Sequence, residues 1–428
     1  MPHVPIDRHT LPNGLRVTLS HDDRAPIVAV NLWYDVGSRH ERPGKTGFAH
    51  LFEHLMFQGS KHVSKGEHFS LLQSIGGSVN ASTWVDRTNY FETVPSHELE
   101  LALWLESDRL ATLLATMTQE KLDNQREVVK NERRSSVDNQ PYGTWEEKLL
   151  ELTFPETHPY HHSTIGSMAD LDAASLADVS DFFTSHYAPN NAVLTIAGDF
   201  DPPVALALVE KHFGPIKANP AIPPGPSSAI DPIIGAEVRE IVPDRVPFPR
   251  VYACYRMPPF GTDGFDALEV VVDLLGTGRA SRLYRALVRE QQVAQDVSLF
   301  AFPFVGGATT FNMSVTARPG IGHEALEQAL FAEVDRLAAE GPSDDELERV
   351  RNLHAANVES SLERVSERAD QLSMYACLFD EPERINSEVS RYLAVDAARV
   401  GEAMAATIRP DNRVVLTYLP AEAPEGTA

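Results

Sequence analysis

Residues 187–196 read Tyr-Ala-Pro-Asn-Asn-Ala-Val-Leu-Thr-Ile, and residues 408–418 read Ile-Arg-Pro-Asp-Asn-Arg-Val-Val-Leu-Thr-Tyr. Pro189 and Pro410 align at an offset of 221 residues, about half of the 428-residue chain. In each copy a helical pattern ends before the proline, and a run of apolar and β-branched residues follows the asparagine. A repeat of this length predicts two homologous α+β domains.

The first half of the chain alternates between strand and helix patterns. Asn13-Gly14 between apolar runs marks a hairpin. Ile27–Tyr34 alternates apolar with other residues, which predicts a strand that is buried on one face. Further strands are predicted within 9–36 and at 191–197, and helices at 47–57, 99–114, 118–134 and 171–186.

A proline-rich break separates the halves. Residues 214–249 contain Pro220, Pro223, Pro224 and Pro226, a composition typical of an ordered but extended linker. The second half repeats the first in outline, with strands predicted at 251–256, 297–301 and 308–317 and helices at 264–275, 323–339, 343–365 and 394–406. The predicted fold is α+β, with homologous α/β-sandwich domains at 1–215 and 246–428, each a mixed sheet covered by helices, and a linker at 216–245.

The composition excludes several classes of protein. Asp and Glu number 61 against 37 Lys and Arg, so a nucleic-acid partner, which needs a basic face, is not expected. No apolar run is long enough to span a membrane. The first residues lack a basic stretch followed by an apolar one, which predicts a cytoplasmic protein, or a periplasmic one if a signal peptide has been removed.

The helix predicted at 47–57 carries a metal-site pattern. His50 and His54 are four residues apart and therefore project from the same face. Glu53 stands beside them, in the HxxEH order. Two neutral imidazoles can hold Zn²⁺, and an adjacent carboxylate that is not a ligand can take a proton from the metal-bound water. Burying these side chains in an apolar helix without a compensating partner would be costly.

A catalytic zinc site usually has a third protein ligand and one open position. The helix predicted at 118–134 offers Glu127 and Glu132, and spacing alone does not choose between them. A second feature is the stretch Gly77–Thr83, whose small and β-prone residues predict an edge strand. An extended peptide could add to that edge through main-chain hydrogen bonds.

Five motifs in one order resemble the pitrilysin/insulinase family of inverzincin metallopeptidases, and most closely its two-domain branch near mitochondrial processing peptidase. They are Leu11-Pro-Asn-Gly-Leu15 with Val17; Val36-Gly37-Ser38 with Glu41; Gly47–Gly59; Gly76–Thr83 with Thr88 and Tyr90; and Val128-Val129-Lys-Asn-Glu132. The resemblance covers nearly the whole chain.

The resemblance implies a role for each site residue. It implies that the zinc ligands are His50, His54 and Glu132, because relatives place the third ligand three residues after the valine pair. It implies that Glu53 is the general base and that the substrate-binding strand comprises Asn80, Ala81, Ser82 and Thr83. Gln125 departs from the pattern, because many relatives carry an acidic residue there that supports the site from the second shell; glutamine can still hydrogen bond.

A second departure concerns partners. Many relatives carry an Arg and a Tyr, about seven residues apart in the C-terminal half, that grip the substrate backbone. Val288 and Gln295 stand at those positions, with Arg289 one residue out of register. The second half also lacks HxxEH. We therefore expect a dimer with a non-identical homologous subunit that carries the Arg/Tyr pair, a homodimer being the simpler alternative.

The predicted function is that of a metalloendopeptidase or oligopeptidase, in which the catalytic domain 1–215 hydrolyses peptides or unfolded segments with water activated by zinc and Glu53. The alternative is a non-catalytic assembly subunit with the same fold, such as the core subunits of a respiratory complex. A purely structural zinc site is disfavoured, because such sites are usually closed by four protein ligands.

Overall fold

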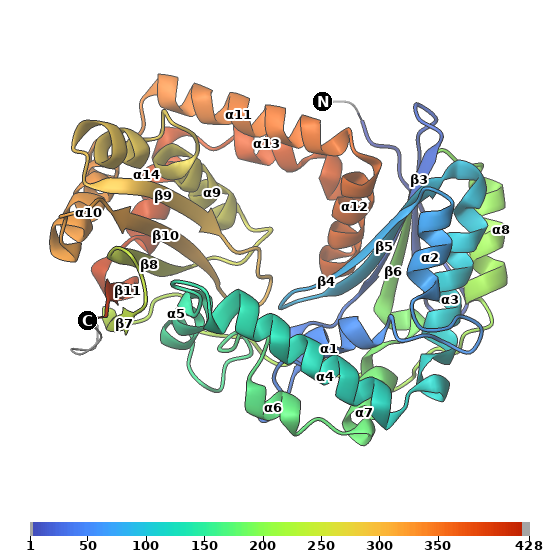
Figure 1. The fold of residues 1–428 in the computed structure, drawn as a ribbon. Coiled ribbons are helices and arrows are strands. Elements are labelled where there is room, and N and C mark those ends of the chain that lie inside the picture. Colours follow the sequence, from blue (N-terminus) through green and yellow to red (C-terminus); the bar gives the residue numbers. More distant parts are fainter. Residues whose placement is uncertain (1–2, 422–428) are drawn as a thin grey trace. The chain divides into compact units, whose positions relative to one another are not determined.

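The computed structural model describes residues 3–421, which form two compact units (Figure 1). The first unit contains the described residues up to Glu132, His162–Pro226 and Asn357–Glu388. The second contains Arg133–His161, Ser227–Ala356 and the described residues from Val389 onward. Each unit thus combines segments from both halves of the chain, which a division at 216–245 does not provide.

The sheet of the first unit has six strands in the order β1-β2-β6-β3-β5-β4. Their bounds are β1 (Asp7–Thr10), β2 (Arg16–His21), β3 (Ile27–Tyr34), β4 (Ser78–Thr83), β5 (Thr88–Pro95) and β6 (Ala192–Gly198). Strands β2 and β6 are parallel and the other neighbours are antiparallel, so the sheet is mixed. Strand β4 lies at one edge.

The helices of the first unit are α1 (Phe48–Leu55), α2 (Glu67–Ser74), α3 (Leu99–Thr116), α4 (Gln119–Arg133), α6 (Met168–Asp172), α7 (Leu176–His186), α8 (Pro202–Phe213) and α12 (Val365–Phe379). The single helix predicted at 171–186 is two helices. Ser175 begins the second one, because its hydroxyl accepts a hydrogen bond from the Asp178 N–H in a capping box.

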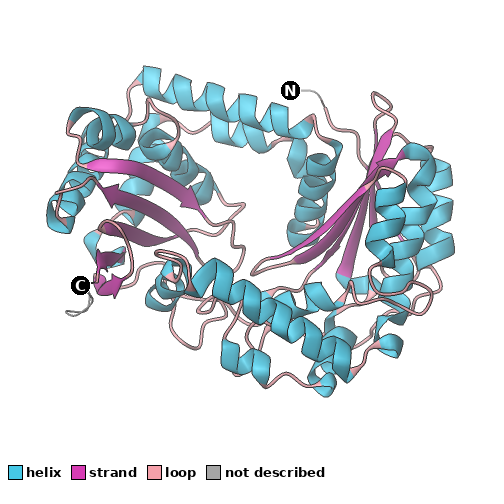
Figure 2. Ribbon diagram, viewed as in Figure 1, coloured by secondary structure: helices cyan, strands magenta, loops and turns pink. Residues whose placement is uncertain are grey.

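Strand β3 is buried on both faces, so the expectation of one buried face was wrong. Val28 and Leu32 lie in the main core, which α1 and α3 share. Ala29 packs with α12, and Trp33 does so on the same face. The second face is covered because α12 packs against β3 and β6, and Figure 2 shows helices on both sides of this sheet.

The sheet of the second unit has the order β7-β11-β8-β10-β9. Its strands are β7 (Val238–Asp244), β8 (Arg250–Met257), β9 (Ala294–Ala301), β10 (Thr309–Ala317) and β11 (Arg413–Pro420). Its helices are α5 (Trp145–Thr153), α9 (Asp263–Gly276), α10 (His323–Glu340), α11 (Asp344–Leu362), α13 (Glu388–Leu393) and α14 (Ala397–Thr407). Helix α11 continues into the first unit. Strand β7 lies within the stretch predicted as a linker; it pairs in parallel with β11.

The two sheets share one topology, which confirms the prediction of two α/β domains. Strands β2-β6-β3-β5-β4 correspond in order to β7-β11-β8-β10-β9, each with one parallel pair. The repeated asparagines also make matching bonds. The Asn191 amide donates to the carbonyls of His186 and Asp35, and the Asn412 amide donates to those of Thr407 and Arg256.

The second face of each sheet is covered by a helix from the other half of the sequence. Helix α12 packs on the first sheet, and α5 packs on β8 and β11 of the second. The offset of 221 residues carries Trp145 of α5 onto Ser366 of α12, so equivalent helices have been exchanged. No described helix is long and apolar enough to cross a membrane.

Candidate metal centre

Helix α1 begins at a position that only glycine suits. Gly47 has φ +83°, and a Cβ there would lie 2.7 Å from the Ile165 carbonyl oxygen. The first turn of α1 is capped from a distance, because the buried Glu41 carboxylate accepts hydrogen bonds from the N–H groups of Gly47 (2.9 Å) and Ala49 (2.7 Å). The ring of His162 in turn donates to Glu41 at 2.9 Å. Glu41 therefore fixes the direction of the helix that carries the predicted metal ligands.

Three ligand atoms converge between α1 and α4. The Nε2 atoms of His50 and His54 are 3.3 Å apart. The Glu132 carboxylate lies 3.7 Å from His50 Nε2 and 3.3 Å from His54 Nε2. Glu127, the competitor on the same helix, forms an ion pair with Lys130 instead. The structure thus brings Glu132, and not Glu127, to the histidines.

These separations fit a zinc ion. Zn–N and Zn–O bonds of about 2.0–2.1 Å in tetrahedral geometry require ligand atoms about 3.3 Å apart. The two Nε2 atoms are 3.3 Å apart, and Glu132 approaches His54 to 3.3 Å through Oε2 and His50 to 3.7 Å through Oε1. The side chains of His50, His54 and Glu132 are 14%, 23% and 42% exposed, so water and substrate can reach the centre.

The electrostatics suit a cation. Burial, followed by the nearby His54, lowers the pKa of His50 to about 4, so its ring is neutral and available as a ligand at neutral pH. The hydrogen bond from His54 lowers the pKa of Glu132, which is therefore ionised. His50 Nδ1 is buried and has no hydrogen-bond partner among residues 3–421.

Glu53 is placed beside the ligands but is held by the edge strand. Its Oε2 accepts a hydrogen bond of 2.6 Å from the Thr83 hydroxyl on β4. Burial raises the pKa of Glu53, and the Thr83 hydrogen bond and the positive charge of Arg87 act in the opposite direction. A carboxylate with a raised pKa that is fixed by one hydrogen bond is suited to accept and return a proton.

The main chain of β4 has a free edge. Trp84 N–H donates to the Arg87 carbonyl, which closes the turn between β4 and β5. Hydrogen-bonded and non-hydrogen-bonded pairs alternate from that point, so the N–H and C=O groups of Ala81 and Thr83 point away from β5. No other described strand pairs with this side. The Asn80 side chain accepts a hydrogen bond from the Ala81 N–H at 2.9 Å.

A polar network that sequence reasoning missed anchors the end of β4. The Ser82 hydroxyl donates to Asn89 Oδ1 at 2.7 Å, and Arg87 donates to the Ser82 carbonyl at 2.9 Å. Asn89 donates to Asp370 of α12 at 3.0 Å, and Asp370 also accepts from Trp33 Nε1. No local pattern could reveal this anchor, since Asp370 lies more than 280 residues from Asn89.

The remaining predicted residues make other contacts. Gln125 is buried on α4, and its amide donates to Asn124, so its support of the centre stays a prediction. In the second unit, Val288 is buried in the core. The Gln295 side chain donates a hydrogen bond to the Ala317 carbonyl. Neither residue provides the guanidinium or phenol group of the Arg/Tyr pair.

A second group of possible ligands lies in the core of the first unit. It contains His68, Glu92 and Glu106, all buried. Arg109 forms an ion pair with Glu106, and its guanidinium lies 4.3 Å from the centre of the Tyr90 ring. Because a buried cation already neutralises this cluster, we describe it as an internal ion-pair network.

Comparisons with known proteins assign the chain to a family. The profile of Insulinase (Peptidase family M16) matches residues 16–166, and that of the Peptidase M16 inactive domain matches residues 173–353. "Zinc protease PqqE" of Helicobacter pylori is 31% identical over 382 residues, covering 86% of this chain and 82% of the relative. The chain belongs to the peptidase M16 (insulinase) family of zinc proteases, as the resemblance predicted.

Solved structures agree with this assignment. The crystal structure of a protease from Helicobacter pylori matches with a TM-score of 0.91 at 27% identity, covering 97% of this chain and 100% of the other. The periplasmic protease PqqL from Escherichia coli matches with a TM-score of 0.79 at 19% identity, covering 99% of this chain and 49% of that protein. The second likeness shows the fold alone.

Proposed function

We propose that this protein is a zinc-dependent endopeptidase or oligopeptidase. The observation that carries the proposal is the mutual spacing of the ligand atoms of His50, His54 and Glu132, which suits tetrahedral zinc. The family relationship supports it, since relatives are named zinc proteases. A non-catalytic assembly subunit would not need four polar residues in this arrangement.

Each residue has a role in peptide hydrolysis. Zinc, when bound by the Nε2 atoms of the histidines and the Glu132 carboxylate, supplies Lewis acidity toward a peptide carbonyl and water. Glu53 takes a proton from the attacking water and delivers it to the leaving nitrogen. The Thr83 hydroxyl orients Glu53 and ties it to the strand that receives the substrate.

The substrate binds as an added strand. Asn80, Ala81, Ser82 and Thr83 form the β4 edge, and the outward main-chain groups of Ala81 and Thr83 offer sequence-independent hydrogen bonds. The Asn80 side chain must leave the Ala81 N–H when a peptide arrives. Such binding favours extended peptides and unfolded segments over folded proteins.

A partner subunit completes the proposal. Val288 and Gln295 offer no Arg/Tyr grip, so we propose a dimer, with either a second copy or a non-identical homologous subunit that carries the pair. The cytoplasmic or periplasmic location stays a prediction.

The test measures zinc content and cleavage of an unstructured peptide by the purified chain. Glu53→Gln should keep zinc and lose hydrolysis by about 10³-fold or more, since it removes the proton acceptor alone. Glu132→Gln should lose zinc. Glu127→Gln is the matched control on the same helix and should resemble wild type.

Two results would contradict the proposal. Equal cleavage by wild type and Glu53→Gln would exclude the proton-transfer role. Zinc retained at full occupancy by Glu132→Gln would exclude the ligand set. A full cleavage rate for the chain purified alone, as a monomer, would remove the need for a partner.

A further inference from the structure

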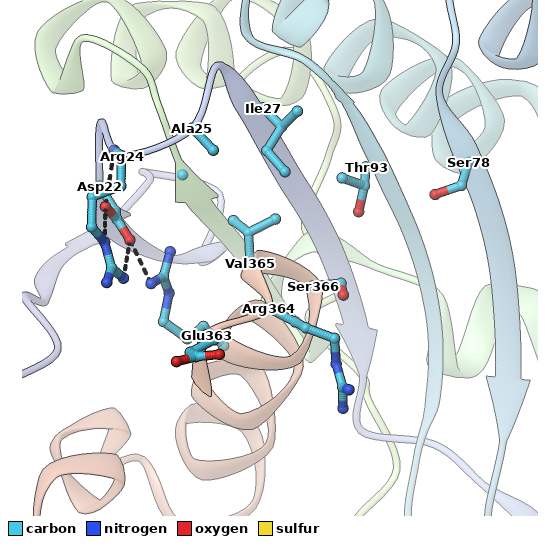
Figure 3. A pocket seen from close by; sticks show the side chains of 12 residues that line it. Asp22, Arg24, Ala25, Ile27, Ser78, Thr93, Glu363, Arg364, Val365 and Ser366 are labelled. Carbon is cyan, nitrogen blue, oxygen red and sulfur yellow. Dashed lines mark hydrogen bonds and ion pairs between the residues drawn. The ribbon is translucent and has the colours of Figure 1, made fainter. Parts of the chain in front are cut away.

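A pocket opens beside the end of β4 that lies away from the metal centre. It has a volume of about 580 Å³ and is formed by the β2–β3 loop, the strands β3 to β6 and the start of α12 (Figure 3). Its lining is partly apolar, with Ile27 and Val365, and partly polar, with Ser78 and Thr93. All of these residues belong to the first unit.

The charges around this pocket favour an anion. Three arginines line it, against two carboxylates. Asp22 is neutralised twice, because it accepts hydrogen bonds from Arg24 at 2.8 and 2.7 Å and forms an ion pair with Arg368. These contacts hold the pKa of Asp22 far below its usual range. The negative charge of Asp22 is therefore neutralised by residues of the pocket itself.

Arg364 is the arginine best placed to meet a ligand. Its side chain is 64% exposed, and its only ion pair among the described residues is with Glu367 at 3.5 Å. Figure 3 shows Arg364 leaving the helix on the side of the strands that carry Thr93 and Ser78, whereas Glu363 lies on the side of Asp22. Arg364 is also the N-cap residue of α12, so the dipole of this helix adds to the positive field around its side chain.

Strand β4 runs from Glu53 of the candidate metal centre to the pocket. Ser78 and Thr83 are the two ends of β4, five residues or about 16 Å apart. Thr83 contacts Glu53, and Ser78 lines the pocket. The side chains of Ser78 and Ser82 share one face of the strand, and Ser82 joins the network that reaches α12 on that face.

We propose that this pocket, which we call the distal pocket, is a specificity site for a carboxylate of the substrate. A peptide added to β4 with its scissile bond at Glu53 would place a residue about five positions away beside Arg364. The carboxylate is supplied either by an Asp or Glu side chain or by the end of the peptide. This inference rests on the proposed function and names a substrate class for it.

The test scans a single glutamate through a neutral, glutamine-containing host peptide, one position at a time on both sides of the scissile bond. Wild type should prefer Glu over Gln in kcat/KM by about two- to fivefold at a position about five residues away, as an exposed ion pair allows. Arg364→Gln should abolish the preference and leave cleavage of the neutral host unchanged. A shortened peptide that ends at the preferred position distinguishes a terminal carboxylate from a side chain.

Arg409→Gln is the matched control, because Arg409 is an exposed arginine in the second unit that pairs with Asp411. It makes the same change in net charge and should keep the preference. A flat scan with a hydrolysed host, or a preference that survives in Arg364→Gln, would overturn the distal pocket alone. Binding of the same peptides to Glu53→Gln, measured by fluorescence anisotropy, decides the matter even where hydrolysis is absent.

Discussion

Helices α1 and α9 occupy the same place in two sheets of the same topology, after β3 and after β8. Helix α1 carries His50, Glu53 and His54, whereas α9 has no histidine and carries Val271, Leu274 and Leu275. All three positions in α9 are buried and apolar. The same position in the fold is thus occupied by an apolar helix in one unit and by a helix with a polar cluster in the other.

The difference shows what the fold requires and what it tolerates. The sheet needs a helix with an apolar face at this position, and α9 provides one mainly through Leu and Val residues. Helix α1 keeps an apolar face through Leu51, Phe52 and Leu55, while it also carries His50, which loses hydration on burial. We therefore expect the polar residues in α1 to serve the proposed metal centre and not the stability of the unit.

Replacing His54 by leucine, a residue type that α9 buries, is the sharpest way to break the comparison. His54→Leu should lose zinc and reduce cleavage by about 10³-fold or more, because ligands and base act as one unit. Unfolding measured in the presence of a chelator should show equal or greater stability. The reverse change, Leu275→His, should cost about 2–3 kcal/mol, because it buries an unpaired polar ring. A loss of stability in His54→Leu as large as that in Leu275→His would contradict this view.

The start of each helix provides a second contrast. Helix α9 is capped locally, since Thr262 accepts from the Phe265 N–H, whereas α1 depends on the remote Glu41. Thr262→Ala should cost about 1 kcal/mol. Glu41→Ala should cost about 3 kcal/mol, because it removes two main-chain bonds and the carboxylate that pairs with His162. Urea unfolding measures both; equal costs would show that Glu41 is no more than an ordinary cap.

The sequence predicted the grouping of His50, His54 and Glu132 better than the exchange of helices. His50, Glu53 and His54 lie on one helix, so their relation follows from helical spacing, and the family motif selected Glu132. Contacts between residues that are far apart in the sequence are not marked by any local sequence pattern. Asp370 could not be linked to Asn89, and the burial of Trp33 could not be foreseen, because α12 arrives from the other half.

Strand β7 was missed for a different reason. Its sequence, VREIVPD, is half exposed and follows a proline-rich stretch, so composition favoured a linker. What makes it a strand is its parallel pairing with β11, about 175 residues later in the chain. Long-range pairing of this kind is set by the partner strand and not by local propensity.

The ion pair behind α1 should make one unit sensitive to pH. Burial lowers the pKa of His162, but the hydrogen bond and charge of Glu41 outweigh it, so the pKa ends above its usual 6.5. Burial also raises the pKa of Glu41, which alone would favour a neutral carboxyl. Glu41 is nevertheless ionised and paired with His162, because it accepts two main-chain N–H bonds that suit a carboxylate.

A group whose pKa is raised by folding stabilises the folded state below its unfolded value and loses that effect as pH rises. The stabilisation that His162 contributes should therefore be full below pH 6.5 and decline above it. We expect this effect to be smaller than those of the His54 and Glu41 substitutions. The measurement compares thermal unfolding of wild type and His162→Gln between about pH 6 and pH 9, with zinc removed so that its ligands do not titrate against the metal. Wild type should lose more stability than the variant over this range. Parallel curves would mean that Glu41 caps α1 equally well beside a neutral ring, and the pH sensitivity would then be absent from both units.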